Sequence, residues 1–126
     1  MRTIILETRT KLSLLWLVIM LNMIFADIFS IIIEFIEHDQ LEIPGDVKTI
    51  MAIAAVITNI PILMILFSRI LNYKWNRIAN ISAALFTMFY VVGGGSLTPH
   101  YIVIGSIEIV LLIAIFITAI KWKEID

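Results

Sequence analysis

The fold is decided by residues 12–36, LSLLWLVIMLNMIFADIFSIIIEFI, an apolar run of 25 residues that contains only two charged side chains. A helix rises 1.5 Å per residue, so about 20 residues cross the roughly 30 Å of hydrocarbon in a bilayer. Comparable runs follow at about 49–71, 78–95 and 101–121. They are too long, and alternate too little, to be strands of a membrane barrel. We therefore expect an all-α integral membrane four-helix bundle, with residues 1–126 forming a single domain.

Composition agrees with a membrane protein. The chain has 126 residues, of which 61% are hydrophobic and 15% charged, and its mean hydropathy is +1.05. A soluble domain is typically about 45–50% apolar and about 25% charged. Four spans leave only short loops, without space for a soluble catalytic or nucleotide-binding domain. The lipid bilayer is thus the predicted partner, and the net charge of −1 gives no reason to expect nucleic acid binding.

Lysine and arginine predict the orientation of the spans. Basic residues concentrate in the N-terminal segment, the second connector and the C-terminal segment: Arg2, Arg9, Lys11, Arg69, Lys74, Arg77, Lys121 and Lys123. With an even number of spans these segments share one side, and the positive-inside rule places that side in the cytoplasm. Both termini are therefore expected to be cytoplasmic. Trp16, Trp75 and Trp122 fall near the same interface, as an aromatic belt predicts.

Two acids lie inside the predicted spans. Asp27 is about 15 residues from the cytoplasmic end of the first span, and Glu108 is about 12 residues from that end of the fourth. A charged side chain in mid-bilayer costs about 2.5–3.5 kcal/mol, so it is a candidate for function. Two carboxyls close together in a medium of low dielectric do not both ionise cheaply. If both face inward without a basic partner, one is protonated or a cation lies between them.

Other polar residues extend this layer. Asn59 in the second span and Tyr90 in the third lie at a similar depth. Residues on one helical face recur every three or four positions, and such spacing groups Asp27 with Ser30 and Glu34, and Glu108 with Tyr101 and Gly105. The predicted ligand- or ion-binding residues are Asp27, Glu108, Asn59, Tyr90, Asn22, Ser30 and Glu34.

Two functional hypotheses follow. In the first, the acids form a buried pocket that binds or transports a proton, a cation, or a small cationic or lipid-like ligand, with a homodimer enclosing the path. In the second, the protein is a structural or accessory subunit, and neutral carboxyls merely join helices by hydrogen bonds. An enzyme acting on lipid has the least support, because no nucleophile and base are arranged for catalysis. No catalytic residue, cofactor or metal site is predicted. His38 and His100 lack metal-ligand spacing.

Pro61 predicts a kink in the second span. Proline has no N–H to donate and clashes with the carbonyl four residues earlier, here that of Ile57. We expect Thr58 or Asn59 to satisfy the freed carbonyl. The kink either widens a pocket or is static, and both interpretations stay open.

Small and polar residues mark the third span. Asn80, Ala83, Ala84 and Thr87 share one face, which favours close helix packing. The glycines at 93–95 are expected to end this helix, the alternative being close approach of the backbone to a ligand.

Several segments carry a family resemblance. These are KLSLLW at 11–16, NMIFADI at 22–28, PG at 44–45, IPILM at 60–64, WNR at 75–77, NI at 80–81 and IEIV at 107–110. On them the chain resembles a family of small, uncharacterised bacterial membrane proteins with four spans, over nearly its whole length. The resemblance implies cytoplasmic termini, a location in the bacterial inner membrane and no particular activity.

A looser likeness links the chain to the four-helix superfamily of sterol isomerases and the sigma-2 receptor. Those proteins have an acid in the first span and a proline-kinked second span, and they bind sterols or cationic amphiphiles. The intramembrane histidine of the isomerases is missing here. The likeness therefore implies ligand binding, at the level of fold only, rather than isomerase activity.

Overall fold

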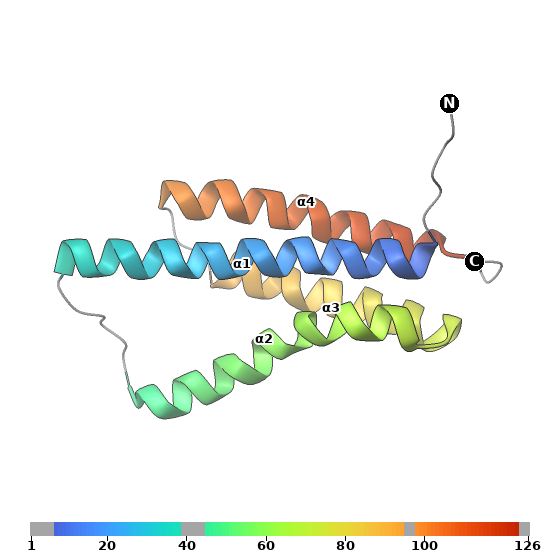
Figure 1. Cartoon of the computed structure of the whole chain (residues 1–126), viewed down its shortest axis with the longest axis horizontal. Helices are drawn as coiled ribbons and strands as arrows, with labels where there is room; N and C mark the ends of the chain where they lie inside the picture. The colour runs from blue at the N-terminus through green and yellow to red at the C-terminus, as the bar shows by residue number, and fades with distance from the viewer. Residues whose placement is uncertain (1–6, 39–44, 95–97, 124–126) are drawn as a thin grey trace.

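The computed structural model describes residues 7–38, 45–94 and 98–123. Its elements are four helices: α1 (Thr8–His38), α2 (Val47–Ile70), α3 (Tyr73–Gly93) and α4 (Pro99–Lys121). The described residues contain no strand, so the predicted all-α class is confirmed. The start of α1, the turn between α2 and α3, and the end of α4 lie together at one end of the bundle, here named the terminal end (Figure 1). The opposite end is named the loop end.

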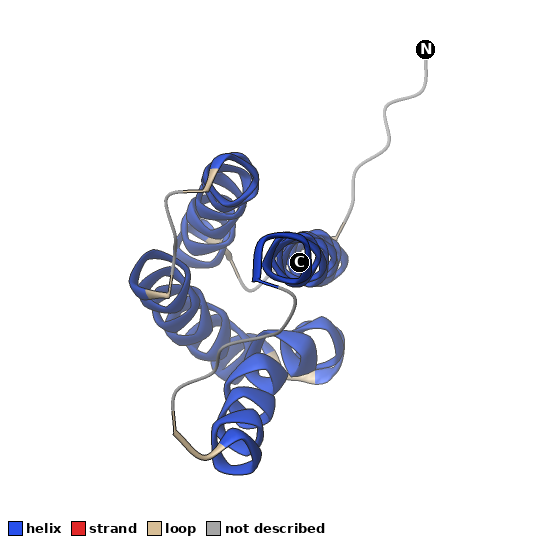
Figure 2. Ribbon diagram, turned by 90° about the vertical axis from the view of Figure 1, so that its left-hand side faces the viewer, coloured by secondary structure: helices blue, strands red, loops and turns tan. Residues whose placement is uncertain are grey.

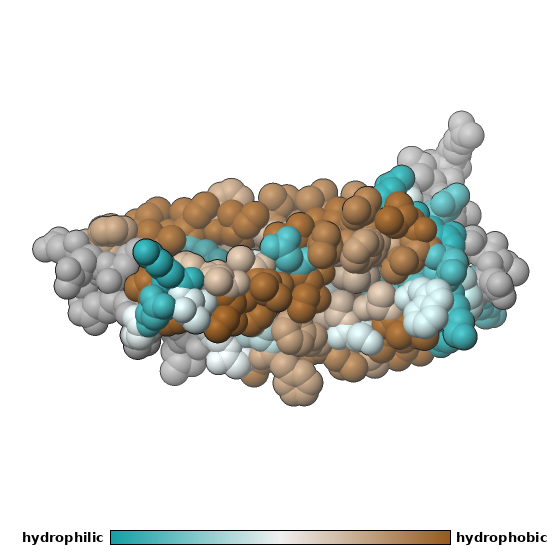
Figure 3. Space-filling model, turned by 90° about the horizontal axis from the view of Figure 1, so that it is seen from below, coloured by the Kyte–Doolittle hydropathy of each residue, from teal (hydrophilic) through white to brown (hydrophobic). Residues whose placement is uncertain are grey.

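Three of the helices, α1, α2 and α4, are long and apolar enough to cross a membrane. The surface agrees with this, because a broad hydrophobic belt lies between hydrophilic groups at the two ends of the molecule (Figure 3). In α3 the first turns carry Asn76, Arg77 and Asn80, which lower its hydropathy. Both asparagines are fully buried, whereas Phe89 on the outward face is 79% exposed. Thus α3 directs its polar groups inward and an apolar surface outward.

Polar side chains fix where α2 and α3 begin. The carboxylate of Asp46 accepts hydrogen bonds from the Lys48 backbone N–H at 3.2 Å and from the Thr49 hydroxyl at 2.6 Å. Asn72 accepts one from the Trp75 N–H at 3.1 Å. Such N-caps satisfy donors that a helix start leaves without intrahelical partners. Because Asn72 is a cap, α3 includes residues 73–77, which the hydropathy pattern had placed in a connector.

The helices form a ring in chain order. α1 packs against α2 and α4, and α3 packs against α4 and α2. Figure 2, seen from the loop end, shows the near end of α2 set apart from the other three helices.

A bend in α2 at Pro61 explains this separation. Figure 1 shows that α2 changes direction near its middle, so its first half diverges from the bundle. The buried residues of α2 are Pro61, Met64 and Ser68, none of which precedes the proline. The predicted kink is therefore confirmed.

The expectation that Thr58 or Asn59 satisfies the Ile57 carbonyl is wrong. The Thr58 hydroxyl donates to the carbonyls of Ala54 and Ala55, at 2.9 and 3.3 Å, and the Asn59 amide donates to Ala55 at 2.6 Å. Both side chains therefore bond one turn back on their own helix, at carbonyls other than that of Ile57.

A buried polar cluster holds the terminal half together, here named the asparagine network. Trp16 Nε1 donates to Asn80 Oδ1 at 2.8 Å, and the Ser68 hydroxyl donates to the same oxygen at 3.3 Å. Asn80 Nδ2 donates to Asn76 Oδ1 at 2.6 Å, and Asn76 Nδ2 donates to the Ser68 carbonyl at 2.7 Å. These bonds join α1, α2 and α3. The third-span stripe is thus confirmed as a packing face, with Ala83 and Thr87 also buried.

Side chains of α3 donate hydrogen bonds to the carbonyls at the end of α4. Arg77 donates to the carbonyls of Ala119 and Ile120, both at 2.9 Å, which places a cation at the negative end of the α4 dipole. The Tyr73 hydroxyl donates to the Trp122 carbonyl at 2.8 Å. The terminal end is consequently closed by hydrogen bonds from side chains to helix ends.

The predicted tryptophan belt is wrong for two of its three members. Trp75 is 58% exposed, but Trp16 is fully buried and Trp122 is 4% exposed. Trp16 is drawn inward by its bond to Asn80, and the Trp122 ring packs edge-on against Tyr73 with centroids 5.2 Å apart.

Candidate functional site

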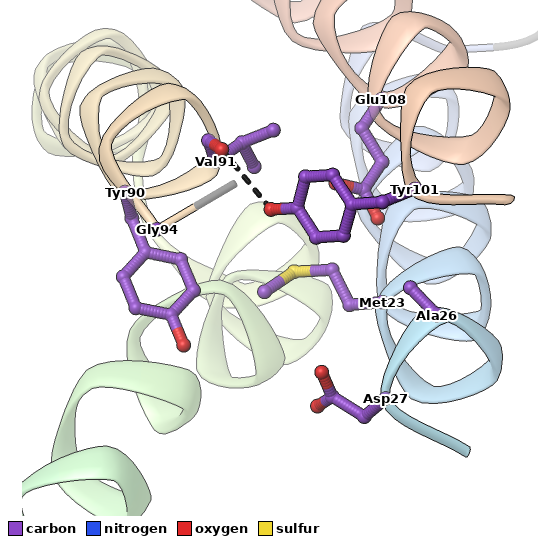
Figure 4. A pocket seen from close by; sticks show the side chains of 8 residues that line it. All are labelled: Met23, Ala26, Asp27, Tyr90, Val91, Gly94, Tyr101 and Glu108. Atoms are coloured by element: carbon purple, nitrogen blue, oxygen red, sulfur yellow. Dashed lines mark hydrogen bonds between the residues drawn. The ribbon is translucent and has the colours of Figure 1, made fainter. Parts of the chain in front are cut away.

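A small pocket lies between α1, α3 and α4 in the loop-end half of the bundle (Figure 4). Its volume of about 70 Å³ gives room for a few water molecules. Its lining residues are Met23, Ala26, Asp27, Tyr90, Val91, Gly94, Tyr101 and Glu108. Three of the four residues predicted to share a layer, Asp27, Tyr90 and Glu108, therefore line one cavity.

Glu108 lies on the inner wall of this pocket. Its side chain is 3% exposed, and its Oε1 atom has no hydrogen-bond partner. Figure 4 shows its carboxyl pointing from α4 into the space behind the Tyr101 ring. It shares the buried face of α4 with Gly105, as the spacing predicts, and with Leu112. A buried polar atom without a partner is costly, so it is a candidate for contact with a ligand.

Asp27 lies at the mouth of the pocket. Its side chain is exposed, and its carboxylate points from α1 into the open space between α1 and α3 (Figure 4). The expectation of two buried acids is therefore wrong for Asp27. The physical reason is the bend at Pro61, because the first half of α2 diverges and leaves this part of the α1 face uncovered.

Two tyrosines complete the wall. The Tyr101 hydroxyl donates to the Val91 carbonyl at 3.0 Å, which joins α4 to the end of α3 across the pocket. Tyr90 lies at the edge and is 36% exposed. Tyr101 was not among the predicted binding residues, although its helical spacing from Glu108 placed both on one face. Gly94 lines the pocket as the C-cap of α3, so the glycines do end the helix as expected.

Neither predicted asparagine lines the pocket. Asn59 is exposed on the diverging half of α2, and its amide is bound to the Ala55 carbonyl. Asn22 donates to the Val18 carbonyl on its own helix at 2.9 Å. The expectation that Asn59 joins the layer is wrong, because matching depth does not bring side chains together when one helix bends away.

Ser30 and Glu34 follow Asp27 toward the loop end without lining the pocket. The Ser30 hydroxyl donates to the Ala26 carbonyl at 2.9 Å and lies 3.0 Å from His100 Nε2, a contact between α1 and α4 that the sequence did not predict. Glu34 is half-buried. The side chain of His38 is outside the described part, so its relation to His100 stays untested.

The charges of the pocket determine what it can hold. Its lining includes two carboxyl groups and two phenols, and it includes no lysine, arginine or histidine. A buried carboxylate needs a compensating positive charge or a proton. Within residues 7–38, 45–94 and 98–123, no group of three histidine, cysteine, aspartate or glutamate side chains could hold a metal ion. The arrangement suits a single small cation or a proton.

Comparison with known proteins gives one relationship. No curated protein and no solved structure matches the chain. The bacterial origin and the likeness to sterol isomerases stay predictions. A family model, in contrast, matches residues 5–126, as the resemblance over nearly the whole chain predicted. The chain therefore belongs to the family of unknown function DUF6326.

Proposed function

We propose that this chain is a four-span membrane protein that binds a small cation, either a proton or a metal ion, in the pocket between α1, α3 and α4. The observation that carries the proposal is the Glu108 carboxyl, which is 3% exposed, lines the pocket and has an oxygen without a partner. Asp27 at the mouth adds a second carboxylate on the path that a cation would take.

The pattern of α3 supports a fourth span. Its buried asparagines are satisfied by hydrogen bonds inside the bundle, so a lipid environment would meet mainly its apolar outer face. In this topology the basic residues put the terminal end in the cytoplasm and the pocket in the outer half of the membrane.

Size and charge favour a small cation over a lipid-like ligand. A cavity of about 70 Å³ holds a few water molecules and is far smaller than the roughly 300–1,000 Å³ of pockets that enclose drug-sized ligands. Anionic ligands are disfavoured by two carboxyls without a basic neighbour in the lining. A partly hydrated cation or a proton fits both constraints.

The asparagine network supports access from the loop end. It fills the terminal half with hydrogen-bonded side chains from α1, α2 and α3, whereas Asp27 is exposed. Passage across the membrane would require this network to open, so the proposal concerns binding. Transport and a homodimer stay predictions.

The test uses the full chain in lipid nanodiscs. Binding to the native state alone raises stability by RT ln(1 + [L]/Kd), so we expect the melting temperature to rise when choline chloride is replaced by sodium or potassium chloride, or when the pH is lowered. The double variant Asp27→Asn with Glu108→Gln should lose these shifts. Glu7→Gln, which removes an exposed acid far from the pocket, is the matched control. Wild-type shifts in the double variant would refute the proposal.

A structural role is the second candidate. The asparagine network favours it, because interhelical hydrogen bonds of this kind hold a bundle together without a ligand. If the role is structural, cations should not change the melting temperature of the wild type. Replacing either acid should then lower the melting temperature in choline chloride.

A further inference from the structure

Two of the buried polar atoms that lack a hydrogen-bond partner lie on neighbouring helices, one on α3 and one on α4. Thr87 Oγ1 belongs to a side chain that is 1% exposed, and Glu108 Oε1 to one that is 3% exposed. The hydroxyls of Ser30, Thr58 and Ser106 donate to the carbonyl four residues earlier, and that of Ser68 donates to Asn80. The Thr87 hydroxyl makes no such bond, so its oxygen is available to a neighbour.

The register of the helix pair places the two atoms at one level. A Cβ added to Gly105 would lie 3.9 Å from Val91 Cγ1, and Arg77 reaches the Ala119 carbonyl. Val91 is fourteen positions after Arg77 on α3, and Ala119 is fourteen positions after Gly105 on α4. The two contacts are therefore equally far apart on both helices, and the antiparallel pair stays in one register between them.

Depth below this contact can be counted along each helix. Thr87 is four residues from Val91 toward the terminal end, about 6 Å, and Glu108 is three residues from Gly105, about 4.5 Å. Both side chains are buried and lie at nearly equal height on neighbouring helices. Glu108 lines the pocket, and Thr87, which is not a lining residue, lies on α3 at about the height of Glu108.

We infer that Thr87 and Glu108 form the floor of a site for a monovalent metal ion, with Glu108 supplying the charge and Thr87 a neutral oxygen. This inference rests on the proposed function and specifies its ligand. Carboxylate and hydroxyl oxygens are hard ligands that suit hard cations. Glu108 is the buried carboxyl of the lining and balances a single positive charge, whereas a divalent ion would need a second buried negative charge, and Asp27 is exposed at the mouth. The pocket above has room for the water that completes the coordination.

The test compares Thr87→Val with Thr87→Ser. Valine keeps the shape of threonine and removes the oxygen, and serine keeps the oxygen. Sodium chloride is titrated at constant ionic strength against choline chloride, and the apparent Kd is taken from the rise in melting temperature of the full chain in nanodiscs. We expect Thr87→Val to raise the apparent Kd for sodium by about tenfold, because it removes one oxygen ligand whose loss costs about as much as that of one hydrogen bond. Thr87→Ser, which keeps the oxygen, should stay close to the wild-type Kd.

Stability without sodium separates this inference from a purely structural role for Thr87, which predicts that Thr87→Val is less stable than the wild type. Under the inference, Thr87→Val in choline chloride should be at least as stable as the wild type, because it removes a buried hydroxyl without a partner. Lower stability there, or unchanged sodium affinity, would overturn the inference. If the wild type responds to pH through Glu108 but not to sodium, the site takes only protons and water, and the inference falls while the proposed function stands. If it responds to neither, both fall.

Discussion

Asn80 is the residue on which the closed terminal half depends most. Its side-chain oxygen accepts from Trp16 at 2.8 Å and from Ser68 at 3.3 Å, and its amide donates to the side-chain oxygen of Asn76 at 2.6 Å. All four side chains are fully buried, each with an exposed fraction of 0%. Replacing Asn80 with leucine, which has nearly the same shape, removes the polar centre without opening a large cavity.

The expected loss follows from what is left behind. Interhelical hydrogen bonds in membrane proteins contribute about 0.6 kcal/mol on average, and a buried group left without a partner costs about 1–3 kcal/mol. The Ser68 hydroxyl can turn to a carbonyl of its own helix, but the Trp16 N–H and the Asn76 oxygen lose a partner that nothing nearby replaces. We expect Asn80→Leu to lower the free energy of unfolding by about 2–4 kcal/mol.

The assay is pulse proteolysis during SDS titration in mixed micelles. Asn22→Leu is the matched control, because Asn22 bonds only to the Val18 carbonyl on its own helix, and we expect a change within about 0.5 kcal/mol. A double-mutant cycle of Asn80→Leu with Trp16→Phe should give a coupling of about 1 kcal/mol. Equal stabilities of Asn80→Leu and Asn22→Leu, or a coupling of zero, would refute the reasoning.

Three further predictions concern the Glu108 carboxyl, the exposure of Asp27 relative to Ser68, and the bend at Pro61. In choline chloride, Glu108→Leu should raise the free energy of unfolding by about 1–3 kcal/mol, because it removes a buried oxygen without a partner; a loss measured by the same SDS titration would mean that the carboxyl holds helices together. Because the chain has no cysteine, single substitutions report exposure: Asp27→Cys should react readily with a membrane-impermeant maleimide and Ser68→Cys should not, and equal rates would contradict the closed terminal half. Pro61→Ala restores an N–H toward the Ile57 carbonyl and should straighten α2, so labelling of cysteine introduced at position 27 should slow; an unchanged rate would show that the bend does not depend on proline.

The elements and their faces could be predicted from local pattern. In α4, the three- and four-residue spacing placed Tyr101, Gly105 and Glu108 on one face, and Gly105 and Glu108 are buried. The bend at Pro61 was also predictable, because a missing N–H acts within its own helix. Less predictable was Thr87, which the spacing placed on a packing face without indicating that its hydroxyl would lack a partner.

The candidate site was only partly predictable. Depth along each span correctly grouped Asp27, Tyr90 and Glu108, but it also included Asn59, which lies on the diverging half of α2. Trp16 was expected at the membrane interface and is instead bonded to Asn80 inside the bundle. In each case the error concerns a neighbour from another helix.

The sequence by itself determined that this chain forms long apolar helices, because in hydrocarbon the backbone must satisfy its own hydrogen bonds and a helix does so within one segment. It also determined the position of each polar residue along its helix and which residues share a helical face, since both follow from the rise and period of that helix. Only the tertiary structure decided which of these residues meet, which acid is buried and which oxygens lack partners. Those outcomes depend on how another helix covers a given face, and that packing is not encoded in the local pattern of either helix alone.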